Sequence, residues 1–237
     1  MLTQIHGKTV SFEVLGKGET VLFIHGWGGS RESLRKLAES VSQKYKAVLI
    51  DLPGFGRSEN PDPSWGIDEY TAIVARFLQK QRLSPVYVFG HSFGGTLALY
   101  LAVRYPKLVK KLVLCAPSYK RGGKKAPFAS LLKNAFPRPI KRLLYGIFFP
   151  TSELYKYPHL EPNFRKIVTQ DVSADMKLIT VPTLILWGDK DSYVPVSHGR
   201  RLQKIIKDSQ LEIFKGIGHG LPVYEPEKVY KSLEKFL

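Results

Sequence analysis

The stretch that decides the fold is VYVFGHSFGG, which spans Val86–Gly95 of a 237-residue chain. Its first four residues are apolar and predict a strand that helices cover on both faces. The pattern from Thr96 to Tyr105 predicts a helix. The Gly-x-Ser-x-Gly turn between them therefore has the strand-turn-helix context of a nucleophile elbow, in which glycines permit a sharp turn that presents the Ser92 hydroxyl. Without that context, Ser92 would read as an ordinary helix cap.

Short apolar segments recur outward from this stretch and alternate with amphipathic ones. This alternation predicts an α/β domain with a mainly parallel sheet. The first strand candidate is Lys8–Leu15. Together with the residues before it, this stretch is better explained as an antiparallel hairpin at one edge of the sheet, with Gln4–Val10 and Ser11–Leu15 joined at Gly7-Lys8. The other expected strands are Thr20–Ile24, Ala47–Ile50, Lys111–Cys115, Thr183–Trp187 and Leu211–Phe214, and the other expected helices are Ser30–Tyr45, Ile67–Arg82 and His198–Lys207.

The alternation breaks between Ser118 and Thr180, where six prolines interrupt helical fragments and no strand pattern appears. We expect residues 1–117 and 181–237 to form the core domain, and residues 118–180 to form a basic helical cap. The cap segment holds twelve Lys and Arg residues against four acidic residues, which gives it a net charge of +8. That is half of the +16 carried by the whole chain, so the cap is expected to attract anionic partners.

Composition excludes several classes of protein. Hydrophobic residues make up 43% and charged residues 24%, which is ordinary globular usage and excludes a disordered chain. The single cysteine, Cys115, lies in an apolar run and predicts a buried thiol. The histidines show no ligand spacing, so neither a metal nor another cofactor is expected. Met1–Val10 lacks the pattern of a signal peptide, and no apolar run reaches the roughly 20 residues of a membrane span, so we expect a cytoplasmic protein without a transmembrane segment.

The serine needs a base, because a hydroxyl is a weak nucleophile until a neighbouring group takes its proton. His219 is the best placed histidine after Ser92, since it lies in the glycine-rich loop Gly216–Gly220 directly after an expected strand. His159 and His198 are better explained as surface residues. The sequence therefore predicts His219 as the general base.

An acid is needed to orient that base, and two aspartates compete for the role. Asp189 and Asp191 both follow the strand Thr183–Trp187, at the sheet edge where catalytic groups of α/β proteins collect. We favour Asp191, while the alternative role of Asp189 is a hydrogen bond to the backbone of its own turn. Spacing alone leaves both open.

Acyl transfer also needs N–H donors for the oxyanion, and losing one costs roughly 3 to 4 kcal/mol. The N–H of Phe93, directly after the serine, is the first expected donor. The second is expected in the loop His25–Gly29, where we favour the N–H of Trp27. A phosphate-binding loop is the other explanation of these glycines, but neither Gly-x-Gly-x-x-Gly nor Gly-Lys-Ser/Thr is present.

Together these stretches resemble the α/β-hydrolase superfamily. The matching motifs are HGWGG at 25–29, DLPGFGRS at 51–58, GHSFGG at 90–95, GDKD at 188–191 and GH at 218–219. The resemblance implies an α/β-hydrolase fold, with a mostly parallel eight-stranded sheet flanked by helices and a small helical cap between the sixth and seventh strands. In the family the acid stands three residues after the glycine that ends its strand, which supports Asp191.

Trp27 and the 51–58 run are most similar to small carboxylesterases of the pimeloyl-carrier-protein methyl esterase type. This resemblance implies a serine esterase with Ser92, Asp191 and His219 as its catalytic triad and a small-molecule ester as its substrate. It also implies an acidic acyl carrier protein as a candidate partner of the basic cap. If the protein is an esterase, Trp27 and the apolar cap residues Phe128, Leu132 and Phe148 are expected to bind the substrate. The alternative role of the cap residues is to pack the cap on the core, and the two roles are compatible.

Four other functions are compatible with parts of this pattern. The same triad could cleave a carbon-carbon bond in a vinylogous diketone, or a carrier-bound acyl ester or thioester. A binding protein that has lost catalysis is disfavoured by the intact Ser92, Asp191 and His219. Nucleic-acid binding driven by charge alone is expected to be weak and salt-sensitive, because no reading motif accompanies the basic residues.

Overall fold

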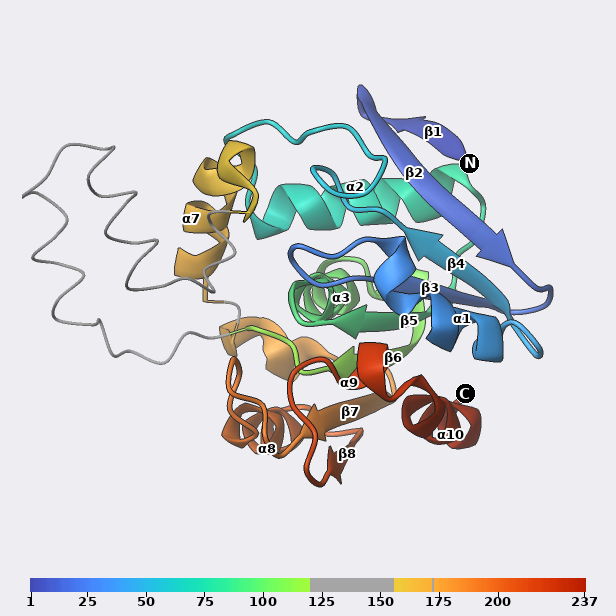
Figure 1. Ribbon diagram of the computed structural model, residues 1–237, viewed down its shortest axis with the longest axis vertical. Helices are drawn as coiled ribbons and strands as arrows, with labels where there is room; N and C mark the ends of the chain where they lie inside the picture. The colour runs from blue at the N-terminus through green and yellow to red at the C-terminus, as the bar shows by residue number, and fades with distance from the viewer. Residues whose placement is uncertain (120–155, 172) are drawn as a thin grey trace, which may run out of the picture.

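Eight strands form one sheet in a computed structural model, which describes residues 1–119, 156–171 and 173–237 (Figure 1). The strand order is β1-β2-β4-β3-β5-β6-β7-β8. The pairs from β4 through β8 are parallel, whereas β1 and β2 run antiparallel to their neighbours, so the predicted mostly parallel sheet is confirmed. The strands are β1 (Leu2–Ile5), β2 (Lys8–Leu15), β3 (Thr20–Ile24), β4 (Lys46–Ile50), β5 (Val86–His91), β6 (Val109–Cys115), β7 (Thr183–Gly188) and β8 (Ser209–Phe214).

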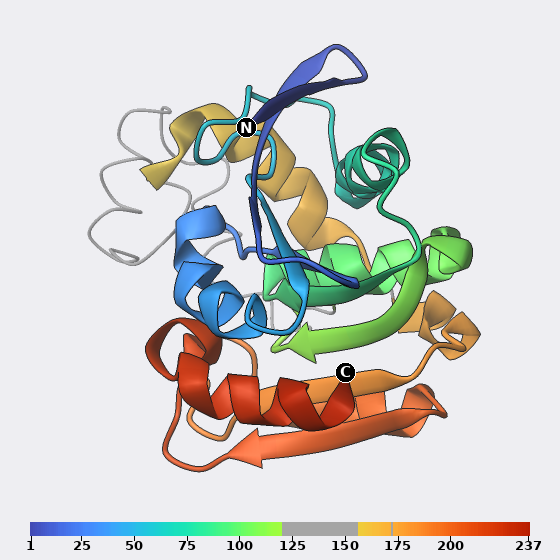
Figure 2. The same cartoon turned by 90° about the vertical axis from the view of Figure 1, so that its right-hand side faces the viewer.

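Helices cover both faces of this sheet and create two cores (Figures 1 and 2). One core includes apolar residues of α2 (Ile67–Lys80), α3 (Phe93–Arg104) and α8 (Ser197–Ile205). The other includes those of α1 (Arg35–Val41) and α10 (Pro226–Phe236). Because both faces are covered, β3 and β5 are buried along their whole length, which explains their unbroken apolar sequences. Two further helices are α7 (Glu161–Thr169) and α9 (Leu221–Tyr224).

Several expected boundaries differ from the structure by a few residues, and two expected elements differ more substantially. The edge hairpin pairs Leu2 with Ser11 and Ile5 with Lys8, so its turn is His6-Gly7 and β2 is the whole of Lys8–Leu15. Both turn residues have positive φ, at 51° and 76°, which matches the twist of a two-residue hairpin. The helix expected over Ser30–Tyr45 is instead a 3-10 turn, Arg31–Leu34, followed by the short α1.

Helix α7 lies within the expected cap and is bound to the core. The buried Asn163 donates from Nδ2 to the carbonyls of Asp62 and Trp65, at 2.7 and 3.1 Å. Gln170, just after the helix, accepts a 2.8 Å bond from the N–H of Ile67 at the start of α2. These contacts fix this part of the insertion against the core. The division into core and cap at residues 118 and 180 stays a prediction, since residues 120–155 lie outside the described part.

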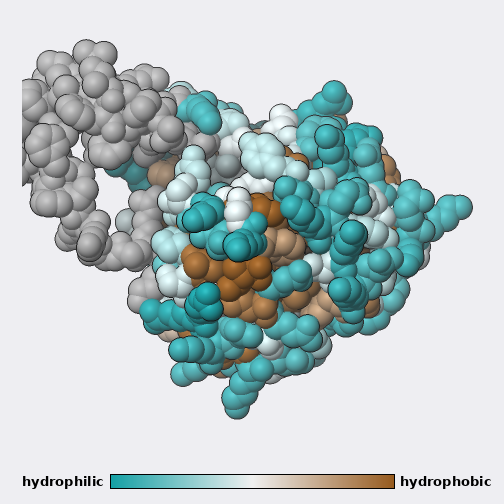
Figure 3. All heavy atoms as spheres, turned by 60° about the horizontal axis from the view of Figure 1, so that its bottom comes forward, coloured by the Kyte–Doolittle hydropathy of each residue, from teal (hydrophilic) through white to brown (hydrophobic). Residues whose placement is uncertain are grey.

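Much of the positive charge lies on the surface. The solvent-facing side of α8 exposes Arg200, Arg201 and Lys204. Figure 3 shows the end of the molecule that carries α8 and β8 as a largely hydrophilic surface with one compact apolar patch. In the described ranges no helix is long and apolar enough to cross a bilayer, and no three His, Cys, Asp or Glu side chains group as metal ligands would.

Candidate active site

The predicted turn around Ser92 joins β5 to α3. Ser92 has a φ of 53°, a strained value for a non-glycine residue, which costs on the order of 1–3 kcal/mol. A Cβ at Gly94 would collide with the carbonyl oxygen of Ile24, and one at Gly90 would collide with that of Gly94. Only glycines therefore allow the turn to pack this closely, and the turn holds Ser92 at the carboxyl edge of the sheet.

Three polar side chains from distant parts of the chain form one hydrogen-bonded line. The hydroxyl of Ser92 lies 2.9 Å from Nε2 of His219, positioned to donate its proton to that nitrogen. Nδ1–H of His219 donates to Oδ2 of Asp191 at 2.7 Å. The carboxylate of Asp191 is fully buried, and its other oxygen accepts the N–H groups of Tyr193 and Val194 at 2.9 and 2.8 Å. The structure thus brings together the three residues that the sequence singled out.

The two aspartates after β7 have different partners. The exposed Asp189 accepts the N–H of Gly216 at 2.6 Å. Its carboxylate therefore bonds the neighbouring loop, whereas the sequence predicted a bond to the backbone of its own turn. Lys190 N–H donates to the carbonyl of Ile217 at 2.9 Å. These bonds clamp the two loops together, which holds His219 beside Asp191.

The loop after β3 lies directly against the serine. A Cβ on Gly26 would be 3.2 Å from the Cβ of Ser92. Residues 26–29 form a tight turn, closed by the bond from Gly29 N–H to the Gly26 carbonyl at 3.1 Å, with Gly28 at a φ of 77°. The Trp27 N–H takes no part in closing this turn. Phe93 is the first residue of α3, so its N–H has no carbonyl one helical turn earlier to bond.

His25 anchors this loop and takes no direct part in the hydrogen-bonded line. It is fully buried, and its Nδ1–H donates to the Gly26 carbonyl at 2.7 Å while its Nε2 accepts the N–H of Leu52 at 3.0 Å. Burial lowers the pKa of its imidazole, which matches this neutral pattern of one donor and one acceptor. His25 therefore ties the loop after β3 to the loop after β4.

His91 is a neighbour of His219 that the sequence analysis did not single out, although it stands next to Ser92. Its Nε2 lies 2.9 Å from the carbonyl oxygen of His219, and the two rings are 5.1 Å apart. Burial, and secondarily the nearby His219, lower the pKa of His91 to about 4. His91 is thus a neutral hydrogen-bond donor to the loop that carries His219.

This pKa predicts a pH dependence of stability. The unfolded chain binds a proton at His91 near pH 6.5 and the folded protein only near pH 4. The contribution of His91 to the stability of the folded state is therefore complete above about pH 6.5 and falls by about 3 kcal/mol as the pH falls to about 4. Urea unfolding at pH 7 and pH 4.5 should show a smaller loss for His91→Gln than for the parent protein. The same substitution at the exposed His159, His159→Gln, is the control for replacing a histidine outside this buried contact.

Aromatic side chains enclose Trp27. Its ring centroid lies 5.1 Å from that of Phe55, 5.5 Å from that of Phe93 and 5.2 Å from that of Phe164 on α7. Of the residues expected to bind substrate, Trp27 therefore borders the site, beside Phe93. The other three, Phe128, Leu132 and Phe148, lie outside the described residues.

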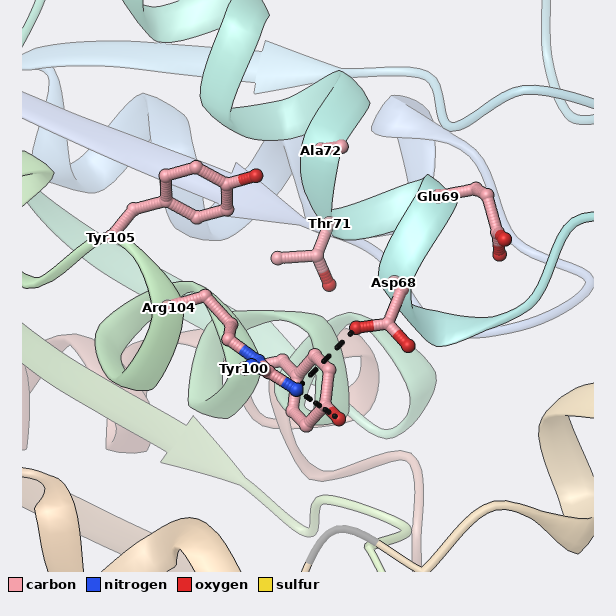
Figure 4. Close-up of a pocket in the computed structure, with 7 residues that line it drawn as sticks. All are labelled: Asp68, Glu69, Thr71, Ala72, Tyr100, Arg104 and Tyr105. Carbon is pink, nitrogen blue, oxygen red and sulfur yellow. Dashed lines mark hydrogen bonds and ion pairs between the residues drawn. The ribbon is translucent and has the colours of Figure 1, made fainter.

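An open hollow of about 470 Å³ lies elsewhere, between α2 and α3 (Figure 4). Arg104 stands in it, with Nη2 at 4.0 Å from Oδ1 of Asp68 and at 3.4 Å from the Tyr100 hydroxyl. None of the three hydrogen-bonded residues described above lines this hollow. It is therefore separate from the candidate site.

Comparisons with known proteins agree with this architecture. The model of the α/β hydrolase fold family matches residues 19–137, which is 119 of the 237 residues. Lipase 1 of Psychrobacter immobilis is 28% identical over 88% of this chain and 73% of its own length. The 2-hydroxy-6-oxo-6-phenylhexa-2,4-dienoate hydrolase of Comamonas testosteroni is 27% identical over 89% of this chain and 84% of its own.

A solved structure shows the same fold. A bacterial membrane phospholipase A superposes with a TM-score of 0.82 at 24% identity, over 100% of this chain and 84% of its own. At that identity the likeness concerns the fold alone. With the family model covering half of the sequence and the strand order in place, the chain belongs to the α/β hydrolase fold family.

Proposed function

We propose that this protein is a serine hydrolase that cleaves carboxylic esters through an acyl-enzyme intermediate. The observation that carries the proposal is the line from Ser92 through His219 to Asp191, with hydrogen bonds of 2.9 and 2.7 Å. A hydroxyl, an imidazole and a buried carboxylate in this order can generate a nucleophile at neutral pH.

The reaction would proceed in two halves. Ser92 Oγ attacks the ester carbonyl while His219 Nε2 takes its proton, and the N–H groups of Trp27 and Phe93 stabilise the oxyanion. The C–O bond to the alcohol then breaks, and His219 returns the proton to the leaving oxygen. In the second half, His219 takes a proton from water, the water oxygen attacks the acyl-enzyme, and the acid leaves as Ser92 regains its proton. Asp191 keeps His219 in the required tautomer throughout.

A carbon-carbon bond hydrolase is the second candidate. It is favoured by one observation, the 27% identity to a relative whose name gives a phenylhexadienoate as its substrate. The hydrogen-bonded line would serve either reaction, because both need an activated nucleophile beside an oxyanion site. Ester cleavage ranks first, since lipases are also among the relatives and a serine, histidine and aspartate suffice for it.

An acidic acyl carrier protein stays a proposed partner only. Most of the basic residues that suggested it lie within 120–155, outside the described part. Carrier-bound esters are therefore a substrate to test after simple esters.

The experiment that tests the proposal is hydrolysis of p-nitrophenyl esters from acetate to laurate, run beside hydrolysis of 2-hydroxy-6-oxo-6-phenylhexa-2,4-dienoate. We expect turnover of the esters with a maximum at one acyl length and little turnover of the dienoate. Turnover of the dienoate alone would favour the second candidate. Failure on both substrates by folded protein would contradict ester hydrolysis of small substrates.

A further inference from the structure

The hydroxyl of Tyr157 reaches the turn that carries the proposed oxyanion donor. It donates to the carbonyl oxygen of Gly28 at 2.7 Å, although the two residues are 129 positions apart in the chain. The ring of Tyr157 is held in place by that of Phe55, with centroids 5.2 Å apart. Leu160, three residues later, is fully buried and lies against Gly54. The hydroxyl is therefore delivered by a segment that is itself packed on the core.

A relay of peptide groups connects this hydroxyl to the Trp27 N–H. The Gly28 carbonyl belongs to the same peptide group as the Gly29 N–H, which donates to the Gly26 carbonyl at 3.1 Å. The Gly26 carbonyl in turn belongs to the same peptide group as the Trp27 N–H. Since each peptide group is planar, fixing its carbonyl also fixes the direction of its N–H. The Tyr157 hydroxyl is thus linked to the Trp27 N–H through two peptide groups and the hydrogen bond between them.

The turn needs such a support because glycines on their own do not hold one conformation. Gly26, Gly28 and Gly29 lose more conformational freedom on ordering than any other residue type would. The bond from His25 Nδ1–H to the Gly26 carbonyl, at 2.7 Å, secures one end of the relay. Tyr157 secures the other.

We infer that Tyr157 is a positioning residue, which sets the oxyanion donor of Trp27 through two peptide groups. This inference rests on the proposed function and adds to it a residue outside the triad and the oxyanion loop. It links catalytic competence to docking of the 156–160 segment, because the hydroxyl is in place only when that segment is packed against the core.

The test is Tyr157→Phe, which keeps the ring against Phe55 and removes only the hydroxyl. Tyr119→Phe is the matched control, because the buried Tyr119 also donates its hydroxyl to a backbone carbonyl, that of His198 at 3.1 Å. With a p-nitrophenyl ester that the parent protein hydrolyses, Tyr157→Phe should lower kcat about tenfold, less than outright loss of a donor, and leave KM within about twofold. The rate of inactivation by p-nitrophenyl diethyl phosphate, whose phosphoryl oxygen occupies the same oxyanion position, should fall by a similar factor.

A structural role alone would lower the melting temperature without this split between kcat and KM. The inference is overturned if Tyr157→Phe keeps kcat within about twofold of the parent, if the loss appears in KM, or if Tyr119→Phe loses as much. Failure of the proposed function would look different, because the parent protein itself would then show no turnover that depends on Ser92.

Discussion

Replacing Ser92 with alanine is expected to lower kcat for ester hydrolysis by about 10⁴-fold or more. The only side-chain hydrogen bond of Ser92 in the described part of the structure is the one to His219, so removing the hydroxyl breaks no other side-chain bond there. On the proposed mechanism, alanine at this position cannot form the acyl-enzyme. The rate that remains would come from water attacking a substrate held by the oxyanion donors.

The fold should survive this substitution. The backbone bonds around the turn, including Thr96 N–H to the Ser92 carbonyl at 3.0 Å, do not use the side chain. The free energy of unfolding should therefore change by no more than about 1 kcal/mol. Ester hydrolysis and thermal unfolding measured on the same preparation check both statements, with the exposed Ser64→Ala as control. Retention of more than a tenth of the parental kcat by Ser92→Ala would show that another group is the nucleophile.

The sheet and the serine turn could be predicted from sequence because both depend on local sequence patterns. The strands of the central sheet are apolar segments such as Thr20–Ile24, and the turn needs glycines at fixed distances from Ser92. The conformation of each of these segments depends mainly on residues within a few positions in the sequence. The resemblance to the α/β-hydrolase superfamily then predicted the fold that these elements form, and the observed strand order confirms it.

Helix α10 was missed, although its sequence carries a usable signal. Pro226 stands at its first position, and Val229, Tyr230 and Leu233 follow at helical spacing. A search for apolar residues at i, i+3, i+4 and i+7 through the end of the chain would have found it.

The contacts that position the candidate site could not be predicted, since they join segments far apart in sequence. The bond from His91 to the carbonyl of His219 spans 128 residues, and that from Tyr157 to Gly28 spans 129. Neither has a local pattern, because the partner in each case is a backbone carbonyl, which every residue possesses. Only the packed fold shows which carbonyl a side chain reaches.

The choice between the two aspartates gives the sharpest remaining prediction. Asp191→Asn should lower kcat about 10⁴-fold, while Asp189→Asn should keep it within about threefold. In Asp191→Asn, the amide oxygen can keep the bonds from Tyr193 and Val194 that now end on Oδ1. The amide nitrogen then replaces Oδ2 and faces His219 Nδ1 with a donor. The imidazole proton is driven to Nε2, which can no longer accept the proton of Ser92.

The two variants make the same chemical change, at an exposed carboxylate in one case and at a buried one in the other, and the two carboxylates have different hydrogen-bond partners. Asp189→Asn retains an oxygen for the N–H of Gly216, so the clamp between the loops persists. Both proteins should unfold within a few degrees of the parent, which separates a change of tautomer from a change of fold. Equal losses of kcat in the two variants would mean that the loop clamp, and not the orientation of His219, controls turnover. A loss confined to Asp191→Asn would assign the orienting role to the one carboxylate that is buried against the base.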